Sequence, residues 1–176
     1  MHDVCCGPVN VAVITLRCTA LQCTMNPTFD SIDDLLLHIE RISRGNHHVL
    51  KRWTAAQNFY HLASAFEGSL NGLAASYPLP VRVLARRLRW VVTRFRFPPW
   101  LPIPSAIRES LDPPASCDFD TEKTRLVLAI HDFQRYTGQH PSHPVLGQLT
   151  RSEWIGFHLR HCEHHLSFIS LKPTPL

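Results

Sequence analysis

Five consecutive residues near the carboxyl end of the chain, His161, Cys162, Glu163, His164 and His165, include three imidazoles. On an α-helix His161 and His165 project from the same side, because four residues make about one turn. Two neutral imidazoles in this relation can bind one transition-metal ion, since Zn²⁺ takes His nitrogens at about 2 Å. The spacing therefore predicts part of a metal site, and a further ligand must come from another segment.

The helix that carries these residues is predicted to bury them. Trp154, His158, His161, His165 and Phe168 recur at intervals of four and three residues, which is the spacing of an inward stripe in a helix bundle. Burying an imidazole without a partner costs about 1–3 kcal/mol, so three on one stripe require a compensating interaction. A metal ion would supply it, and so would a hydrogen-bonded cavity. Hydrogen-bonded core histidines without a metal are the alternative.

His61 is the proposed third ligand, and it lies in a helix predicted over about residues 53–73. Small or polar residues share its side of that helix: Gln57, Ser64, Ala65 and Gly68. Small side chains opposite the histidine stripe would leave room for an ion and a small molecule. The alternative is an ordinary histidine at the surface or in helix packing.

Four polar residues on these two helices are candidates to orient the metal ligands: Gln57, His158, Glu163 and His164. His164 is expected at the edge of the stripe. For each candidate, a solvated helix face is the alternative, and Cys162 is interpreted as a packing residue. The other histidines are expected at the surface or in turns: His2, His38, His47, His48, His131, His140 and His143.

Helical periodicity recurs along the chain after residue 24. Ser31 with Asp34, and Thr150 with Glu153, are N-terminal capping patterns that precede the first and last predicted helices. A helix over about 121–136 is predicted to bury Leu126, Ile130 and Phe133. A helix over about 80–97 is predicted to bury a narrow stripe and to expose arginines opposite it: Leu84, Leu88, Val91 and Phe95 inside, and Arg82, Arg86, Arg89 and Arg96 outside.

No segment alternates convincingly as a strand, so the predicted class is all-α. The first two long helices are joined by a short loop and should be antiparallel, whereas about residues 74–120 separate the second pair from the first. We therefore predict a four-helix bundle in up-down-down-up order. Its long crossover carries the extra, arginine-bearing helix.

Composition is that of an ordinary globular domain of 176 residues, 44% hydrophobic and 18% charged. We predict one domain over residues 25–176, preceded by a poorly ordered extension over residues 1–24. Four of the six cysteines lie in that extension, none in zinc-finger spacing, so we expect a reducing, cytoplasmic compartment. No apolar run is long enough to span a membrane.

Three segments carry a resemblance to a known superfamily. They are W-x7-H from Trp53 to His61, H-P-x-L-G-x-L-T-x-x-E-W from His143 to Trp154, and H-x-x-H-H-L-x-F from His161 to Phe168. Together they resemble the DinB/YfiT-like superfamily, and are closest to a branch of uncharacterised proteins. The resemblance covers about residues 28–170.

This resemblance implies a four-helix bundle whose three metal ligands fall on His61, His161 and His165. Characterised members include transferases and isomerases that use low-molecular-weight thiols such as bacillithiol or mycothiol, and homodimers are common among them. The expected cofactor is a divalent transition metal, Zn or Ni first, with Fe, Co or Cu as alternatives because three imidazoles suit all of them.

The leading functional hypothesis is a metal-dependent transferase that acts on a low-molecular-weight thiol or its electrophilic partner. A metal-dependent hydrolase is the second enzymatic hypothesis, and a non-catalytic, metal-stabilised bundle that binds a ligand or partner is the third. Neither a nucleic acid nor a membrane is expected as a partner. The arginines between 82 and 96 alternate with a predicted core stripe, as on any solvated helix face.

Overall fold

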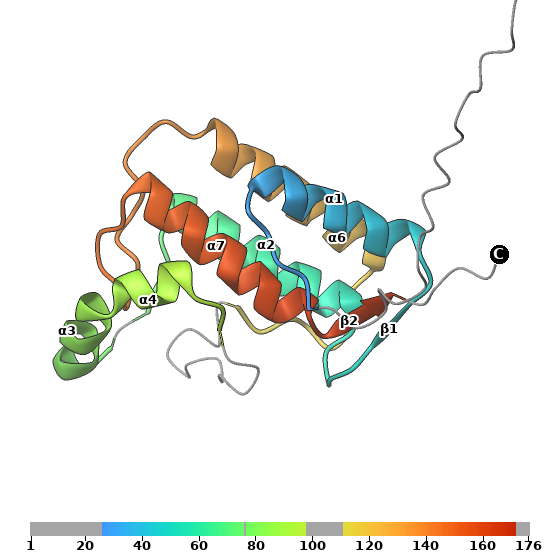
Figure 1. Ribbon diagram of the computed structural model, residues 1–176, viewed down its shortest axis with the longest axis horizontal. Helices are drawn as coiled ribbons and strands as arrows, with labels where there is room; N and C mark the ends of the chain where they lie inside the picture. The colour runs from blue at the N-terminus through green and yellow to red at the C-terminus, as the bar shows by residue number, and fades with distance from the viewer. Residues whose placement is uncertain (1–25, 76, 98–110, 172–176) are drawn as a thin grey trace, which may run out of the picture.

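The computed structural model describes residues 26–75, 77–97 and 111–171, and this part of the chain is mostly helical (Figure 1). The elements run in the order α1 (Ile32–Arg44), β1 (His47–Val49), α2 (Ala55–Asn71), α3 (Leu79–Arg87), α4 (Arg89–Arg94), α6 (Phe119–Arg135), α7 (Arg151–Leu166) and β2 (Ile169–Leu171). The all-α class is confirmed. The predicted extension over residues 1–24 and much of the proline-rich crossover lie outside the described residues.

Local sequence determines where the long helices begin. Ser31, Thr54 and Thr150 each accept a hydrogen bond from the backbone of the third helical residue, whose side chain bonds back to the cap. These capping boxes satisfy amide groups that have no partner within the helix. The predicted starts at Ser31 and Thr150 are therefore confirmed. Among the described helices, none combines the length and apolar character needed to cross a bilayer.

One hydrophobic core joins α1, α2, α6 and α7. Helix α2 packs along α6 and against α7, and α1 contacts both α6 and α7. The largest fully buried side chains include Leu35, Ile39, Phe59, Leu62, Phe66, Leu126, Ile130 and Phe133. The stripe predicted on the 121–136 helix, Leu126, Ile130 and Phe133, is thus buried, which removes its apolar surface from water.

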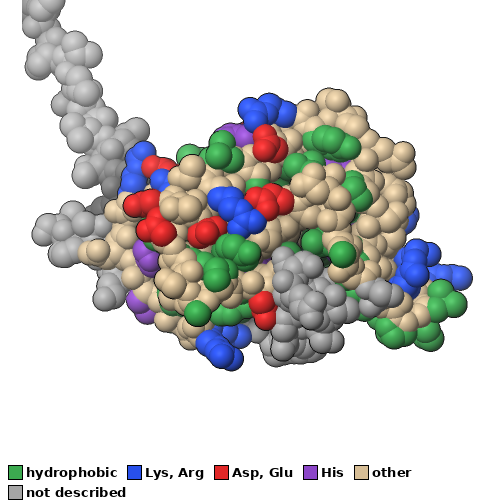
Figure 2. Space-filling model, turned by 180° about the vertical axis from the view of Figure 1, so that it is seen from behind, with side chains coloured by type: hydrophobic (Ala, Val, Ile, Leu, Met, Phe, Trp, Pro, Cys, Tyr) green, Lys and Arg blue, Asp and Glu red, His purple; other side chains and the backbone are tan. Residues whose placement is uncertain are grey.

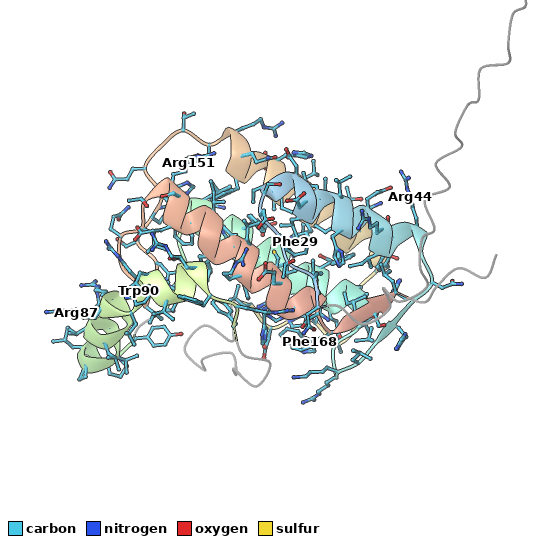
Figure 3. All side chains as sticks on the ribbon, viewed as in Figure 1. Phe29, Arg44, Arg87, Trp90, Arg151 and Phe168 are labelled. Carbon is cyan, nitrogen blue, oxygen red and sulfur yellow. The ribbon has the colours of Figure 1, made fainter. Side chains whose placement is uncertain are left out.

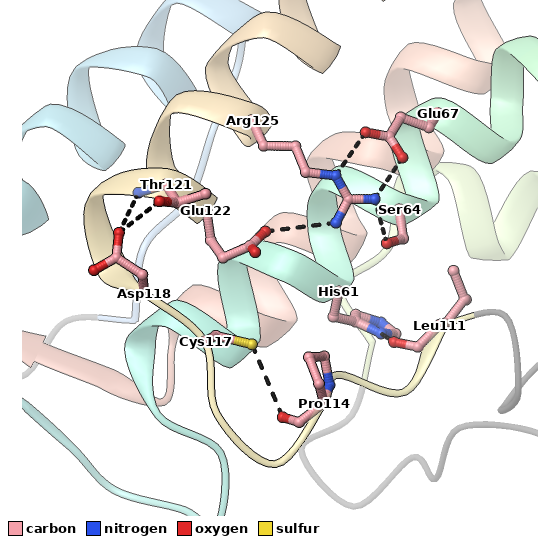
Figure 4. Close-up of polar contacts among 10 residues, drawn as sticks. All are labelled: His61, Ser64, Glu67, Leu111, Pro114, Cys117, Asp118, Thr121, Glu122 and Arg125. Carbon is pink, nitrogen blue, oxygen red and sulfur yellow. Dashed lines mark hydrogen bonds and ion pairs between the residues drawn. The ribbon is translucent and has the colours of Figure 1, made fainter.

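A polar clamp fixes the register of α6 against α2 (Figure 4). The Arg125 guanidinium donates to both carboxylate oxygens of Glu67, at 2.8 and 2.6 Å, and to Ser64 Oγ at 3.0 Å. Bidentate arginine–carboxylate pairs are directional, so they oppose sliding of one helix along the other. Ser64 and Glu67 follow His61 at intervals of three residues, and the clamp therefore also sets the rotation of the helix that carries His61.

The segment before α1, where Phe29 is labelled in Figure 3, is tied to α7 by a buried carboxylate. The Phe29 backbone N–H donates to Glu163 Oε1 at 2.7 Å, and Arg160 lies 2.9 Å from the same oxygen while donating to the Phe29 carbonyl. Glu163 is fully buried. Glu163, which lies between the ligand candidates His161 and His165 in α7, thus binds the segment that leads into α1.

Two short strands that the sequence did not predict pair with one another. β1 lies between α1 and α2, and β2 follows α7. β1 pairs antiparallel with β2, with His47 opposite Leu171 and Val49 opposite Ile169. Three residues are too few to show the alternation by which strands are recognised in a sequence. The pair holds the loop that leads to Lys51 and Trp53 beside the end of α7.

The predicted helix over residues 80–97 is wrong in two respects. It is broken at Leu88 into α3 and α4, and its predicted core stripe is exposed: Leu84 is 62% exposed, Leu88 45% and Phe95 56%. No residue of α3 is buried. Instead, α4 contacts α7 through Thr93, where a side-chain carbon on Gly156 would lie only 2.3 Å from the Thr93 carbonyl oxygen. Glycine at this position permits the close approach.

Candidate metal centre

The three imidazoles of His61, His161 and His165 meet between α2 and α7. One nitrogen from each ring lies within 4.8 Å of the other two. His61 Nε2 and His161 Nε2 are 3.1 Å apart, and the ring centroids of His61 and His165 are separated by 4.3 Å. The predicted convergence of these residues is present in the structure. Their exposed fractions are only 1% for His61, 9% for His161 and 5% for His165.

Hydrogen bonds set the protonation of two of these rings. His61 Nδ1 lies 2.9 Å from the Leu111 carbonyl oxygen, which can only accept, so Nδ1 carries the proton (Figure 4). His165 Nδ1 lies 3.2 Å from Asn58 Oδ1. Asn58 Nδ2 donates to the Thr54 carbonyl at 2.9 Å, which turns the amide oxygen toward His165. Both rings therefore present an unprotonated Nε2 to the shared space, as metal-binding histidines do.

Burial also keeps the cluster neutral. Desolvation lowers the pKa of His61 to about 4, against weaker opposing effects from the Leu111 carbonyl and the nearby Asp112 charge. The pKa values of His161 and His165 are held well below 6.5, first by desolvation and then by the neighbouring His61. A neutral imidazole is the form that donates a lone pair to a metal.

Aromatic rings and two cationic side chains surround the imidazoles. Trp53 stacks on His165 with ring centroids 5.8 Å apart and an angle of 14°, and it lies 5.1 Å from His61. Phe97 lies 6.0 Å from His161. The charges of Lys51 and Arg96 lower the pKa of His164, after the larger effect of burial. The surroundings are therefore apolar, with positive charge beside His164.

Two of the predicted orienting residues on α7 do not contact the three ligands by hydrogen bonds. His158 is buried but stacks on Phe66, with centroids 3.9 Å apart, and on Trp154. Glu163 is engaged with Phe29 and Arg160, as described above. His164, predicted at the edge of the stripe, is 7% exposed and packs edge-to-face on His165 at 5.0 Å.

Gln57 acts on the site through the loop that supplies the Leu111 carbonyl. Its side-chain oxygen accepts the Thr54 N–H, and its Nε2 donates to the carbonyl oxygens of Pro114 and Ala115 at 2.9 and 3.3 Å. Gln57 is half-buried, and these bonds join its side chain to the loop between Leu111 and α6. Cys162 is fully buried in the hydrophobic core, in agreement with a packing role, and burial raises the pKa of its thiol.

Sequence reasoning did not assign two residues that orient these rings: Asn58 and Leu111. Asn58 is buried in the structure, and its place three residues before His61, on the same side of the helix, was the available signal. Leu111 acts through its backbone carbonyl, which no side-chain pattern reveals. Leu111 also lies 50 residues from His61 in the sequence.

His140 and His143 differ in how the predictions for them turned out. His140 was expected at the surface or in a turn; it lies in the segment between α6 and α7, is only 6% exposed, and its Nδ1 bonds to the Ser69 carbonyl at 3.0 Å. His143 shapes a turn as expected, because its Nδ1 accepts the N–H groups of Val145 and Leu146, both at 3.1 Å. Desolvation lowers the pKa of His143 to about 4.

This lowered pKa predicts a loss of stability in acid. An unfolded histidine titrates near 6.5, so between pH 6.5 and 4 the unfolded chain binds more protons than the folded one, and the free energy of unfolding falls as pH decreases. Replacing His143 by Asn keeps an acceptor for the two N–H groups but cannot titrate. We expect His143→Asn to reduce the difference in unfolding free energy between pH 7 and pH 4 by roughly 2–3 kcal/mol.

Urea denaturation at both pH values measures this difference. The exposed His48 provides the control, and His48→Asn should leave the pH dependence close to that of the wild type. If the unfolding free energy of His143→Asn fell between pH 7 and pH 4 as much as that of the wild type, His143 would not be kept neutral by burial.

The residues present fit a divalent transition metal. Two nitrogens that each lie about 2.0–2.1 Å from one ion are about 3 Å apart, in agreement with the 3.1 Å between the Nε2 atoms of His61 and His161. His161 Nδ1 and His164 Nδ1 have no hydrogen-bond partner within the described residues. A three-histidine set would leave a further coordination position for water or a substrate atom.

Comparison with known proteins places the chain in a family. The sequence model of a family described as "Protein of unknown function (DUF1569)" matches residues 22–172, and the chain belongs to this family. No curated protein and no solved structure matches the chain. The family match spans every described helix, the three converging histidines and the Asn58 and Leu111 groups that orient two of them.

Proposed function

We propose that this chain is a DinB-like metalloprotein that catalyses transfer to or from a low-molecular-weight thiol. The proposed metal ligands are His61, His161 and His165. The observation that carries the proposal is the meeting of three neutral, buried imidazoles from two helices, with one nitrogen of each within 4.8 Å of the others.

The proposed architecture is an up-down-down-up bundle of α1, α2, α6 and α7. The packing of α2 on α6 and α7, and of α1 on the same two helices, supports this arrangement. In Figure 1 the colour gradient runs one way along α1 and α7 and the opposite way along α2 and α6. The crossover between α2 and α6 contains α3 and α4.

The surroundings of the site suit a thiol more than a highly polar substrate. A metal ion at the three imidazoles would lower the pKa of a coordinated thiol, so that the thiolate nucleophile forms at neutral pH. Lys51 and Arg96 favour an anionic group on that side of the site. The rings of Trp53 and Phe97 exclude water, which strengthens these charge interactions.

Elemental analysis of protein purified without a histidine tag tests the metal. We expect about one Zn or Ni per wild-type chain and a drop to background in His61→Ala and in His165→Ala, because each variant removes one of three ligands. His48→Ala provides the matched control, since this histidine is exposed on β1 and outside the cluster. Circular dichroism shows whether each variant keeps its helices.

Retention of full metal content by folded His61→Ala would contradict the shared site. Absence of metal from the wild type, together with no uptake of added Zn²⁺ or Ni²⁺ in a titration, would contradict the metalloprotein proposal. Metal bound without any thiol-dependent turnover would remove only the transferase assignment.

The burial of all three imidazoles also favours a second candidate, a metal that only stabilises the helices. Chelation separates the two functions. An enzyme loses thiol-dependent turnover when the metal is removed and recovers it on reloading. A structural site instead shows its main effect in the thermal midpoint, because binding to the folded state alone adds directly to its stability.

A further inference from the structure

An arm formed by residues 79–96, which contains α3 and α4, projects from one end of the molecule (Figures 1 and 3). Among the described residues, ten large hydrophobic side chains are exposed, and seven of them belong to this arm: Leu79, Val81, Val83, Leu84, Leu88, Trp90 and Phe95. Figure 2 shows apolar and basic side chains side by side at the tip of the arm. Apolar side chains gathered on a surface in this way mark an interaction site.

The arm also holds the positive charge of the protein. It contains six arginines and no acidic residue, whereas the whole chain has a formal net charge of +4, so the remaining residues carry a net charge of −2. Arg87 and Arg94 are exposed. This asymmetry orients the arm toward a negatively charged partner and the rest of the molecule away from it.

Contacts with the folded core hold the arm in place. Thr93 packs against Gly156 on α7, Arg89 pairs with Glu153 at 3.1 Å, and its Nη1 donates to the Gln148 carbonyl. The exposed apolar side chains of the arm therefore belong to a segment that is held against the rest of the molecule. A partner that buries them would remove this apolar surface from water, which is favourable.

The combination of arginine with exposed tryptophan, phenylalanine and leucine defines the chemistry of this partner. An amphipathic helical segment of this composition lies in the headgroup region of an anionic bilayer, with its apolar side chains among the acyl chains. A second copy of the chain would bring two arms of the same charge together. A nucleic acid would pair with the arginines but leave the seven apolar side chains in water.

Contrary to the sequence-based expectation of no membrane partner, we propose that the arm is an interfacial membrane-binding element that docks on an anionic lipid surface through Leu84, Trp90 and Phe95, with Arg87 and Arg94 at the lipid headgroups. The element lies on the bilayer and does not cross it. This binding is separate from the proposed metal site, because the named arm residues do not contact the three imidazoles by any described hydrogen bond or ring contact.

Co-sedimentation of the full chain with vesicles tests the proposal. We expect binding to phosphatidylcholine vesicles that contain phosphatidylglycerol, no binding to phosphatidylcholine alone, and release at high salt. Each arginine removed should weaken partitioning about fivefold, so Arg87→Gln with Arg94→Gln should weaken it about 25-fold. Leu84→Ser with Trp90→Ser should weaken it at least about tenfold, since buried apolar area drives interfacial binding.

Matched surface variants on α1 serve as controls. Leu37 is 60% exposed and Arg44 is an exposed arginine, so Leu37→Ser with Arg44→Gln changes the same residue types outside the arm and should leave binding unchanged. Metal content should be equal in all variants.

Four results would overturn the proposal. They are no binding to anionic vesicles, equal binding to neutral ones, binding that the arm variants leave unchanged, and binding that the α1 variants weaken equally. If the chain did not bind vesicles but formed a dimer that Leu84→Ser dissociates, the arm would instead be the contact with a second copy of the chain. A salt-sensitive nucleic-acid complex without vesicle binding would assign it to a nucleic acid.

Discussion

Glu163→Ala is expected to lower the free energy of unfolding by about 3–5 kcal/mol. The Glu163 carboxylate is fully buried, accepts a hydrogen bond from the Phe29 N–H and forms an ion pair with Arg160. Removing it leaves the guanidinium of Arg160, whose side chain is only 20% exposed, without its counter-charge, and it leaves the Phe29 backbone N–H without its acceptor. Unfolding in guanidinium chloride, followed by circular dichroism, measures the change in the free energy of unfolding.

A second ion pair with the same spacing provides the control. Arg135 and Asp132 are also three residues apart, with 2.7 Å between Arg135 Nη2 and Asp132 Oδ1, but their side chains are 73% and 57% exposed. Asp132→Ala should therefore cost less than about 1 kcal/mol. A Glu163→Ala loss as small as that of Asp132→Ala would show that the tie between Phe29 and α7 contributes little to stability.

Asn58→Leu is expected to weaken metal binding by about 10- to 100-fold. Asn58 Oδ1 accepts the Nδ1 proton of His165, which fixes the ring and directs Nε2 toward the other two imidazoles. Leucine has a similar volume but no acceptor for the Nδ1 proton. The His165 ring would then lose the contact that fixes its orientation, and its Nε2 would become a less basic ligand. Competition with a chromogenic chelator measures the affinity, and this prediction depends on the metal proposal.

Ser69→Ala is the matched control for this variant. Ser69 is fully buried on the same helix and bonds to the Phe66 carbonyl, three turns away from Asn58. Both variants remove a buried polar group from α2, so both should lower stability, but only Asn58→Leu should change metal affinity. Equal affinities in the two variants would show that the amide does not orient the ligand.

Sequence periodicity and capping patterns account for most of the predicted fold. The starts at Ser31 and Thr150, and the buried stripe of Leu126, Ile130 and Phe133, were predicted correctly because each depends on neighbours within one or two turns. The same reasoning failed for the helix predicted over residues 80–97. Its apolar spacing satisfied the helical period, but within the described residues no element covers Leu84 and Leu88, which stay exposed.

The sequence by itself determined that His161 and His165 face the same side of one helix, because covalent spacing and helical geometry decide that relation. It also indicated His61, through the small side chains beside it. Only the tertiary structure decided that Leu111 and Asn58 orient two of the rings, that Glu163 turns away to hold Phe29, and that the arm stays exposed. These contacts join residues 50 to 134 positions apart, and chain packing brings such residues together without leaving a local pattern in the sequence.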